Sequence, residues 1–292
     1  MELKITAART GQLSSFLKGE MKMTSGLMNK LKWGEGIQVN GNPQRTNFVV
    51  RPGDMITVCL DEEPPEYPAE DGRIEILYED DHLLAVDKPA GMLIHPSRSC
   101  NSGTLANFVA GYYRKTRQNS AFHPMTRLDR DTFGVVLLGK NAHVHTLLQT
   151  LDVGKTYHAL VWQGPKENSG IIDAPIARKP LPSLLREIRP DGKPSVTEFH
   201  VLERKDDICA LALHPVTGRT HQLRLHCAYS GFPILGDPQY FSEESMTHSV
   251  QLGLASQLLC AKELQLTHPL TGAKLKIASR MDEKQYGKNP LL

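Results

Sequence analysis

Residues 123–141 constrain the fold more tightly than any other part of this chain. Four consecutive apolar residues, Val135 to Leu138, lie between two glycines and have the composition of a short buried β-strand. Just before them, residues 127–131 carry four charged side chains in five positions. A charge at the edge of a core is costly without a partner, so these side chains require partners from elsewhere in the chain. If the segment is extended, Arg127, Asp129 and Asp131 share one face while Leu128 and Arg130 take the other; a surface salt-bridge cluster is the alternative.

A second constraint is a segment rich in proline and acidic residues that divides the chain. Residues 61–82 carry ten acidic side chains against one arginine, whereas residues 1–60 have eight basic and four acidic ones and residues 83–292 have 25 and 18. The prolines favour an extended segment and the charges favour a solvated one. We therefore expect a small domain over residues 1–60, a linker over 61–72 and a large domain over 73–292. Two basic bodies joined by an acidic segment suit a polyanionic partner.

Composition excludes several classes of protein. With 40% apolar and 23% charged residues in 292 positions, the chain has the composition of a soluble globular protein. It has no apolar run near the roughly 18 to 20 residues that span a bilayer, and its first residues show no signal-peptide pattern. Its five cysteines are scattered and form no Cys-x-x-Cys pair, which favours free thiols in a reducing, cytoplasmic compartment. Nothing in the sequence calls for more than a monomer.

Two enzyme classes are disfavoured by the spacing of possible catalytic residues. His143 and His145 are two positions apart, and His221 and His226 are five apart, so neither pair forms the i, i+4 face of a metal-binding helix. We therefore expect no bound metal. The chain also lacks the Gly-x-Ser-x-Gly turn of serine hydrolases.

Residues 1–60 have the pattern of a small α+β unit. Helical patterns cover Gln12–Lys18 and Ser25–Lys32, and Thr24 or Ser25 is a suitable cap for the second helix. The dipeptide Asn40-Gly41 is typical of a tight hairpin turn. Short apolar runs that predict strands lie at Ile37–Val39, Phe48–Val50 and Met55–Leu60.

The larger unit alternates between strand and helix patterns. A turn at Asp80-Asp81 separates two short strands in residues 74–91, and Thr220 is placed to cap a helix after Gly218. Helices are expected at Leu105–Arg114 and His143–Leu151, and strands at Lys155–Val161, Thr197–Glu203, Ile208–His214, Leu258–Leu266 and Leu275–Ile277.

Four sequence motifs follow one another through the larger unit. They are Lys-Pro-Ala-Gly at 88–91 with His-Pro at 95–96, Arg-Leu-Asp-Arg-Asp-Thr-Phe-Gly at 127–134, Lys-Thr-Tyr at 155–157 and Gly-Arg-Thr-His-Gln-Leu-Arg at 218–224. In this order they resemble the motifs of the RluA/RluD-type pseudouridine synthases, and the resemblance covers nearly the whole chain. Thr126 and Phe133 depart from the family pattern, which usually has His and Ser at these positions.

The resemblance implies an α+β protein with the pseudouridine synthase fold. This fold is a large mixed, mostly antiparallel β-sheet flanked by helices, here joined to a small N-terminal α+β RNA-binding domain. The implied activity is that of an isomerase that converts specific uridines of structured RNA to pseudouridine, with ribosomal RNA favoured over transfer RNA. The family reaction uses no cofactor.

The resemblance also assigns roles to individual residues. In the family the aspartate after Arg-Leu is catalytic, which points to Asp129. The family pairs this carboxylate with an arginine, here Arg224, and stacks the target base on a tyrosine, here Tyr157. Such an arginine favours the charged carboxylate and fixes its orientation, and an aromatic ring replaces the stacking that a flipped base loses. Supporting positions are Arg127, Lys155 and Leu223.

Residues 1–60 resemble the S-four-type RNA-binding domain through their two helices, Ile-x-Val-Asn-Gly and Pro-Gly-Asp-x-Ile-x-Val. In that family a basic second helix and the following turn meet the RNA backbone, which points to Lys30, Lys32 and Arg45. The alternative is a non-catalytic RNA-binding or ribosome-assembly protein on the same fold, which would not need Asp129 or Tyr157. The sequence leaves open whether Asp129 acts as a nucleophile or as a base.

Overall fold

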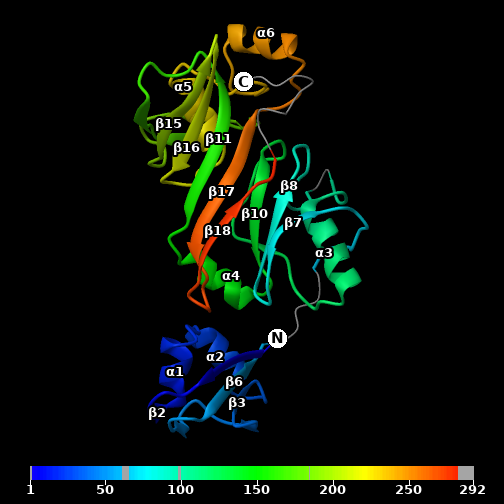
Figure 1. The fold of residues 1–292 in the computed structure, drawn as a ribbon, viewed down its shortest axis with the longest axis vertical. Coiled ribbons are helices and arrows are strands. Elements are labelled where there is room, and N and C mark those ends of the chain that lie inside the picture. The colour runs from blue at the N-terminus through cyan, green and yellow to red at the C-terminus, as the bar shows by residue number, and fades with distance from the viewer. Residues whose placement is uncertain (1, 61–65, 98–99, 184, 282–292) are drawn as a thin grey trace.

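The computed structural model describes residues 2–60, 66–97, 100–183 and 185–281, so the first part of the expected linker, residues 61–65, lies outside it. Two larger β-sheets are present, one before the linker and one after it (Figure 1). No helix in the described ranges is both long and apolar enough to cross a membrane. All five cysteines are free thiols.

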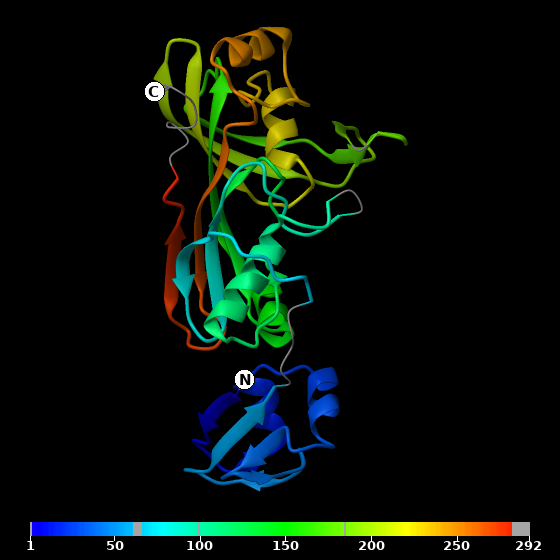
Figure 2. The same cartoon turned by 90° about the vertical axis from the view of Figure 1, so that its right-hand side faces the viewer.

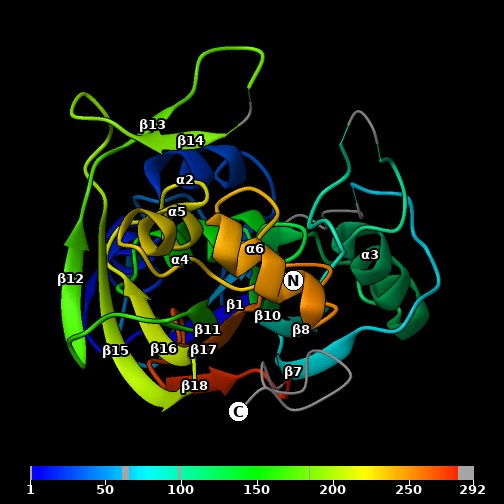
Figure 3. The same ribbon diagram turned by 90° about the horizontal axis from the view of Figure 1, so that it is seen from above.

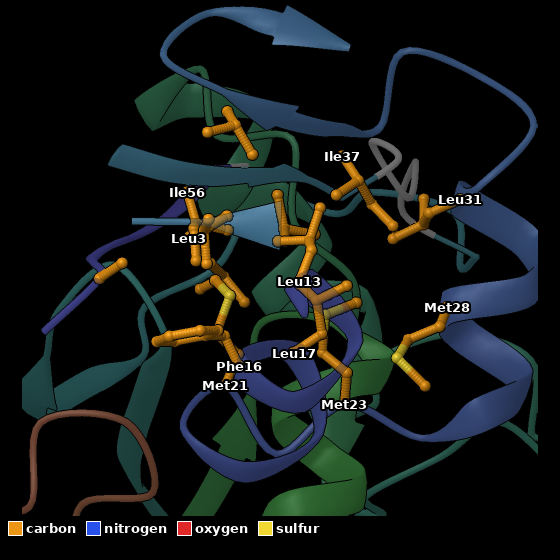
Figure 4. Packing of buried hydrophobic residues seen from close by; sticks show 14 of the residues in the cluster. Leu3, Leu13, Phe16, Leu17, Met21, Met23, Met28, Leu31, Ile37 and Ile56 are labelled. Carbon is orange, nitrogen blue, oxygen red and sulfur yellow. The ribbon is translucent and has the colours of Figure 1, made fainter. Parts of the chain in front are cut away.

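The first sheet has four antiparallel strands in the order β1-β6-β3-β4, and a short β2·β5 ladder lies beside it. Figure 4 shows the core of this unit, where Leu13, Phe16 and Leu17 of α1 meet Ile37 and Ile56 of the sheet. These five side chains are wholly buried. The elements are β1 Glu2–Thr6, β2 Gly11–Gln12, α1 Leu13–Gly19, α2 Ser25–Leu31, β3 Ile37–Val39, β4 Asn42–Pro43, β5 Val49–Val50 and β6 Met55–Cys59.

Local sequence signals account for the ends of these elements. The hydroxyl of Thr24 accepts a hydrogen bond from Leu27 N at 3.2 Å and caps α2. Asn40 and Gly41 have φ values of +51° and +80°, as a tight hairpin turn between β3 and β4 requires. Both expected helices agree with α1 and α2 to within one residue at each end.

The second sheet has ten strands, eight of them in the order β12-β15-β16-β11-β17-β10-β8-β7, with β18 paired to β17 and β9 to β10. Every pairing is antiparallel except β10·β17, so the sheet is mixed and mostly antiparallel, as expected. The strands are β7 Glu75–Glu79, β8 Leu83–Lys88, β9 His123–Pro124, β10 Phe133–Gly139, β11 Gly154–Trp162, β12 Ser169–Asp173, β15 Val196–Lys205, β16 Ile208–Pro215, β17 Leu259–Thr267 and β18 Lys274–Ala278. A separate hairpin pairs β13 Ile176–Arg178 with β14 Arg186–Ile188.

The parallel pair β10·β17 joins the two halves of this sheet. It is short, with Phe133 opposite Cys260 and Gly134 opposite Ala261. Gly134 has φ +108°, and a Cβ there would lie 2.3 Å from the Ala261 carbonyl oxygen. The junction therefore requires glycine at this position.

Helices cover both faces of the part formed by β8 and β10. The helix α3, Leu105–Thr116, packs with Val136 and Leu138 of β10, whereas α4, Ala142–Gln149, packs with the alternate side chains Val135 and Leu137. This arrangement explains the unbroken apolar run in β10, because a strand covered on both faces has no polar side. Helix α5, Gln222–Tyr229, packs on β11, β15 and β16, and Figures 2 and 3 show it on the same side of the sheet as α3. The last helix is α6, Glu243–Gln251.

The elements expected in the larger unit are found with ends shifted by at most two residues. The expected solvated linker is only partly correct. Residues 66–72 are largely exposed, but Glu70 N donates to Asn107 O at 3.0 Å and Asn107 Nδ2 donates to Pro68 O at 3.0 Å. Gly111 of α3 allows this contact, since a Cβ there would overlap the Glu70 carbonyl. This part of the linker is therefore anchored on α3.

Candidate active site

Asp129 lies in the loop that joins β9 to β10. The segment 127–131 is not extended throughout, so the condition for the expected alternation is not met: the chain turns at Arg130 and Asp131, and Thr132 N donates to Asp129 O at 3.2 Å. Arg130 and Asp131 form a local ion pair at 3.1 Å. Asp129 takes no part in this local pair, and its side chain is 29% exposed.

A buried lysine binds the backbone of this loop. Lys88, at the end of β8, has no exposed surface, and its Nζ donates to three carbonyl oxygens at 2.9 Å, those of Pro89, Met92 and Arg130. Burial lowers the pKa of Lys88 to about 7, while the negative charges of the two loop aspartates act in the opposite direction. The protonated amine, which has three N–H groups for the three carbonyls, therefore ties the start of the Lys-Pro-Ala-Gly motif to the backbone beside Asp129.

Arg224 of α5 binds two carboxylates at once. Its Nη1 donates to Asp129 Oδ2 at 2.9 Å, as the sequence predicts for this pair, and its Nε and Nη2 donate to Asp237 at 2.7 and 2.8 Å. A further bond runs from Nη2 to Gln239 Oε1 at 3.0 Å, and the guanidinium lies 5.2 Å from the centre of the Tyr240 ring. Burial lowers the pKa of Arg224, but the two carboxylates outweigh burial and raise it. Asp129 is thus bound by an arginine whose orientation is fixed by Asp237 and Gln239.

The start of α5 differs from the expectation. Thr220 does not cap the helix; the N-cap is His221, which has φ +58° and makes no side-chain capping bond. The Gln222 side chain instead stabilises the turn, since its Oε1 accepts from Arg219 N at 3.0 Å and from Thr217 Oγ1 at 2.8 Å. The left-handed conformation at His221 directs its side chain toward the Asp129 site.

His221 is a site residue that the sequence analysis did not assign. Its Nε2 lies 3.9 Å from Asp129 Oδ1, and its Nδ1 lies 2.9 Å from the Tyr240 hydroxyl, which accepts from Arg186 N at 2.8 Å. The hydroxyl donates to Nδ1, so the proton of a neutral ring is on Nε2, facing Asp129. Burial lowers the pKa of His221, which favours this neutral form.

These groups surround a cavity of about 490 Å³. Tyr157 of β11 is part of its wall, and burial together with the charge of Asp129 raises the pKa of Tyr157 to about 12, so the phenol stays neutral. Burial also lowers the pKa of Lys155.

Thr126, one of the two departures from the family pattern, is buried in the wall, while Phe133 is buried in β10. All the site residues expected in the larger unit line this cavity: Arg127, Asp129, Lys155, Tyr157, Leu223 and Arg224.

A second cavity shares Gly218, Arg219 and Thr220 with the first and lies along the β13–β14 hairpin. Its charged lining residues are mainly basic: Arg178, Arg186, Lys193 and Arg219, with one acidic residue, Asp191. Arg189 does not line it and pairs with Asp191 and Glu187. The basic lining matches the charge of an RNA backbone.

The three basic residues expected to bind RNA lie elsewhere. Lys30, Lys32 and Arg45 belong to the first unit and line neither cavity. Asp237, Tyr240 and Lys88 are parts of the site to which the sequence analysis assigned no role. The signal for Asp237 was its motif, Gly-Asp-Pro-x-Tyr at 236–240, whose partners become visible only in three dimensions.

Comparison with known proteins identifies the family. The family model of RNA pseudouridylate synthases matches residues 82–229. RNA pseudouridine synthase YjbO of Bacillus subtilis, itself uncharacterized, is 34% identical over 265 residues, which cover 88% of this chain and 91% of that protein. The chain belongs to the RNA pseudouridylate synthase family. As a member of that family it is an isomerase that converts uridine in RNA to pseudouridine.

Two further similarities agree with this family. Ribosomal large subunit pseudouridine synthase D of Pseudomonas aeruginosa is 32% identical over 260 residues, covering 85% of this chain and 81% of that protein. The structure of Human RNA Pseudouridylate Synthase Domain Containing 1 matches with a TM-score of 0.58 and 24% identity over 73% of this chain and 86% of that chain. The expected family and fold are therefore confirmed.

Proposed function

We propose that this pseudouridine synthase acts on large-subunit ribosomal RNA and uses Asp129 as its catalytic residue. Relatives named ribosomal large subunit pseudouridine synthases C and D support the substrate class. The observation that carries the catalytic role is the 2.9 Å bond between Asp129 and Arg224 at the wall of the cavity. The proposal includes a cytoplasmic enzyme that acts as a monomer on structured RNA.

The geometry suggests how the two carboxylate oxygens divide their tasks. Oδ2 of Asp129 accepts the bond from Arg224, whereas Oδ1 faces His221 across 3.9 Å. Oδ1 is therefore the oxygen available to the nucleotide. The bond from C1′ of ribose to N1 of uracil breaks, C1′ bonds to C5, C5 loses its proton and N1 gains one, so the reaction is balanced without a co-reactant. Oδ1 serves equally for attack on ribose or for removal of a ribose proton.

The other cavity residues have roles that follow from their chemistry. The Tyr157 ring supplies a flat apolar face for the flipped base, with Leu223 beside it. Lys155 and the exposed Arg127 are cations suited to phosphate. In the N-terminal unit, Lys30, Lys32 and Arg45 serve as further RNA contacts.

The proposal is tested in a strain that lacks the gene. The strain is complemented with wild type, Asp129→Asn or Asp131→Asn, and pseudouridines in total RNA are mapped chemically by reverse-transcription stops. Asp131→Asn is the matched control, because it makes the same change two residues away on a side chain that does not line the cavity. We expect large-subunit sites restored by wild type and by Asp131→Asn but lost with Asp129→Asn.

Other outcomes would contradict specific parts of the proposal. Restoration by Asp129→Asn would show that Asp129 is not the catalytic residue. Sites restored only in transfer RNA would refute the substrate class. RNA binding without any restored site would favour the non-catalytic alternative. Light scattering of the purified protein tests the monomer.

A further inference from the structure

Trp33 is an unusual surface residue of the N-terminal unit. It is 75% exposed and lies in the turn that follows α2. A side chain this large is rarely so exposed, because it leaves a wide apolar face in water. The other tryptophan of the chain, Trp162, is partly buried, with its ring centre 4.5 Å from that of His248. Stability of the core therefore does not explain the position of Trp33.

Two cations from different elements lie over the Trp33 ring in cation–π contacts. Lys32 Nζ is 5.0 Å from the ring centre, and Arg45 Cζ is 5.6 Å from it. Lys32 is the C-cap of α2, whereas Arg45 lies in the loop between β4 and β5. Within the described ranges neither cation is paired with a carboxylate. Their charges are therefore available to an anion that approaches the ring.

The backbone around this group is well supported. Gly36 lets the chain turn back toward β3, since a Cβ there would come within 2.9 Å of the Leu31 side chain. Gln44 N donates to Ile37 O at 2.9 Å, and Phe48 N donates to Arg45 O at 2.9 Å. These bonds hold the Arg45 loop beside the end of α2. The aromatic face and its two cations are thus presented on a framework that exists before any ligand binds.

We propose that Trp33 stacks on an unpaired base of the RNA substrate while Lys32 and Arg45 contact the phosphates that flank this base. An exposed aromatic ring with two cations close to it has the features that single-stranded nucleic acid requires, a stacking surface and neutralised backbone charge. One exposed ring supplies less contiguous apolar surface than the large patches that typically mark protein–protein interfaces. The inference rests on the proposed function, because it assumes a structured RNA substrate, and it adds a base-binding site outside the catalytic cavity.

Such a site has a predictable selectivity. Every base has a flat face, so stacking on Trp33 tolerates sequence but requires a base that is not paired. A loop or bulge in the RNA satisfies this requirement and a continuous duplex does not. The N-terminal unit would therefore select RNA by its secondary structure, at a distance from the uridine that is modified.

The test uses the intrinsic fluorescence of Trp33 in the full-length protein. Trp162→Phe leaves Trp33 as the single reporter and changes a residue outside both cavities described above. A ten-nucleotide single-stranded uridine-rich RNA and a blunt RNA duplex of the same length are titrated separately. We expect saturable quenching by the single strand and little by the duplex. Equal quenching by both, or no quenching at saturation, overturns the inference.

Two substitutions test the ring itself. Trp33→Leu should weaken binding of the single strand by about 5- to 150-fold, the range for loss of one base–aromatic stack. Trp33→Phe keeps a ring and should lose about 3-fold or less. Thermal unfolding is measured for both variants to verify that they fold. Unchanged affinity in Trp33→Leu, or equal losses in Leu and Phe variants that fold normally, would refute the stacking role.

An activity assay separates this inference from the proposed function. Wild type and Trp33→Leu are compared on large-subunit ribosomal RNA from the strain that lacks the gene. We expect KM to rise in Trp33→Leu while kcat changes little, because the ring is remote from the cavity. An inactive wild type would contradict the proposed function itself. An active wild type with the same KM as Trp33→Leu would contradict only the role of Trp33.

Discussion

Asp237 provides a sensitive test of how the site is held together. Its carboxylate is fully buried and binds Arg224 Nε at 2.7 Å and Nη2 at 2.8 Å, while Oδ1 also accepts from Gln239 N at 2.9 Å and Tyr240 N at 3.1 Å. Asp237→Asn keeps an oxygen at the Oδ1 position. It replaces the other oxygen by an NH2 group that faces the Nε–H of Arg224, so one charge-assisted bond becomes a contact between two donors.

The expected cost follows from this geometry. Removing one partner of a buried ion pair typically costs about 3 to 5 kcal/mol. Asp237→Asn should lie at the lower end, at about 3 kcal/mol in free energy of unfolding, because the backbone bonds to Oδ1 survive and Arg224 still has Asp129. Arg224 then loses the bond from its Nε to residue 237, and both Arg224 and Asp129 shift. We expect kcat to fall about 10- to 100-fold, as a displacement near 1 Å at a catalytic group can produce.

The assay combines urea unfolding, RNA affinity and single-turnover pseudouridine formation. RNA affinity should change by no more than about 2-fold, because Asp237 has no exposed surface that RNA could contact. Asp207→Asn, the same change at an exposed turn, is the control and should alter none of the three measurements. If Asp237→Asn unfolds at the wild-type urea concentration and retains the wild-type kcat, Asp237 does not support Arg224.

Three further predictions concern other parts of the site and fold. The pKa of Lys88 is lowered from 10.5 to about 7, so between pH 7 and pH 10.5 the unfolded chain binds more protons at this side chain than the folded chain does. The free energy of unfolding of wild type should therefore rise relative to that of Lys88→Met between pH 7 and pH 9. Urea unfolding at both pH values measures this difference. Tyr157→Leu should lower kcat/KM by about 5- to 150-fold and Tyr157→Phe far less, because stacking requires the ring. In Gly111→Ala the new Cβ overlaps the Glu70 carbonyl, so residues 66–72 should lose their contact with α3. We expect Tm to fall by a few degrees and trypsin to cleave faster at Arg73.

Elements set by local signals could be predicted from the sequence. The run Val135–Leu138 is a strand because its apolar side chains serve cores on both faces, and α2 begins where Thr24 can cap it. The contact between Asp129 and Arg224 was also predictable, although 95 residues separate the two, because the motifs around them resemble a known family. Their roles in catalysis stay predictions.

Features that depend on distant partners could not be predicted. Asp237 gives no local sign that it binds Arg224, and the left-handed His221 follows from a turn stabilised by the Gln222 side chain instead of a Thr220 cap. The anchored linker depends on Gly111, whose lack of a side chain matters only because Glu70 lies against it. In each case the decisive contact is made across the sequence and leaves no periodic pattern.

The position of β17 bears on when the enzyme becomes active during synthesis. Strands β10 and β11 follow each other in the chain, yet β17, made about a hundred residues later, lies between them. Before Leu259–Thr267 has left the ribosome, the loop that carries Asp129 and the strand that carries Tyr157 have no common framework. Such late pairing is slow to form, because the long intervening chain must be closed first. A nascent chain therefore cannot modify the RNA that surrounds it, and activity begins only with a nearly finished protein.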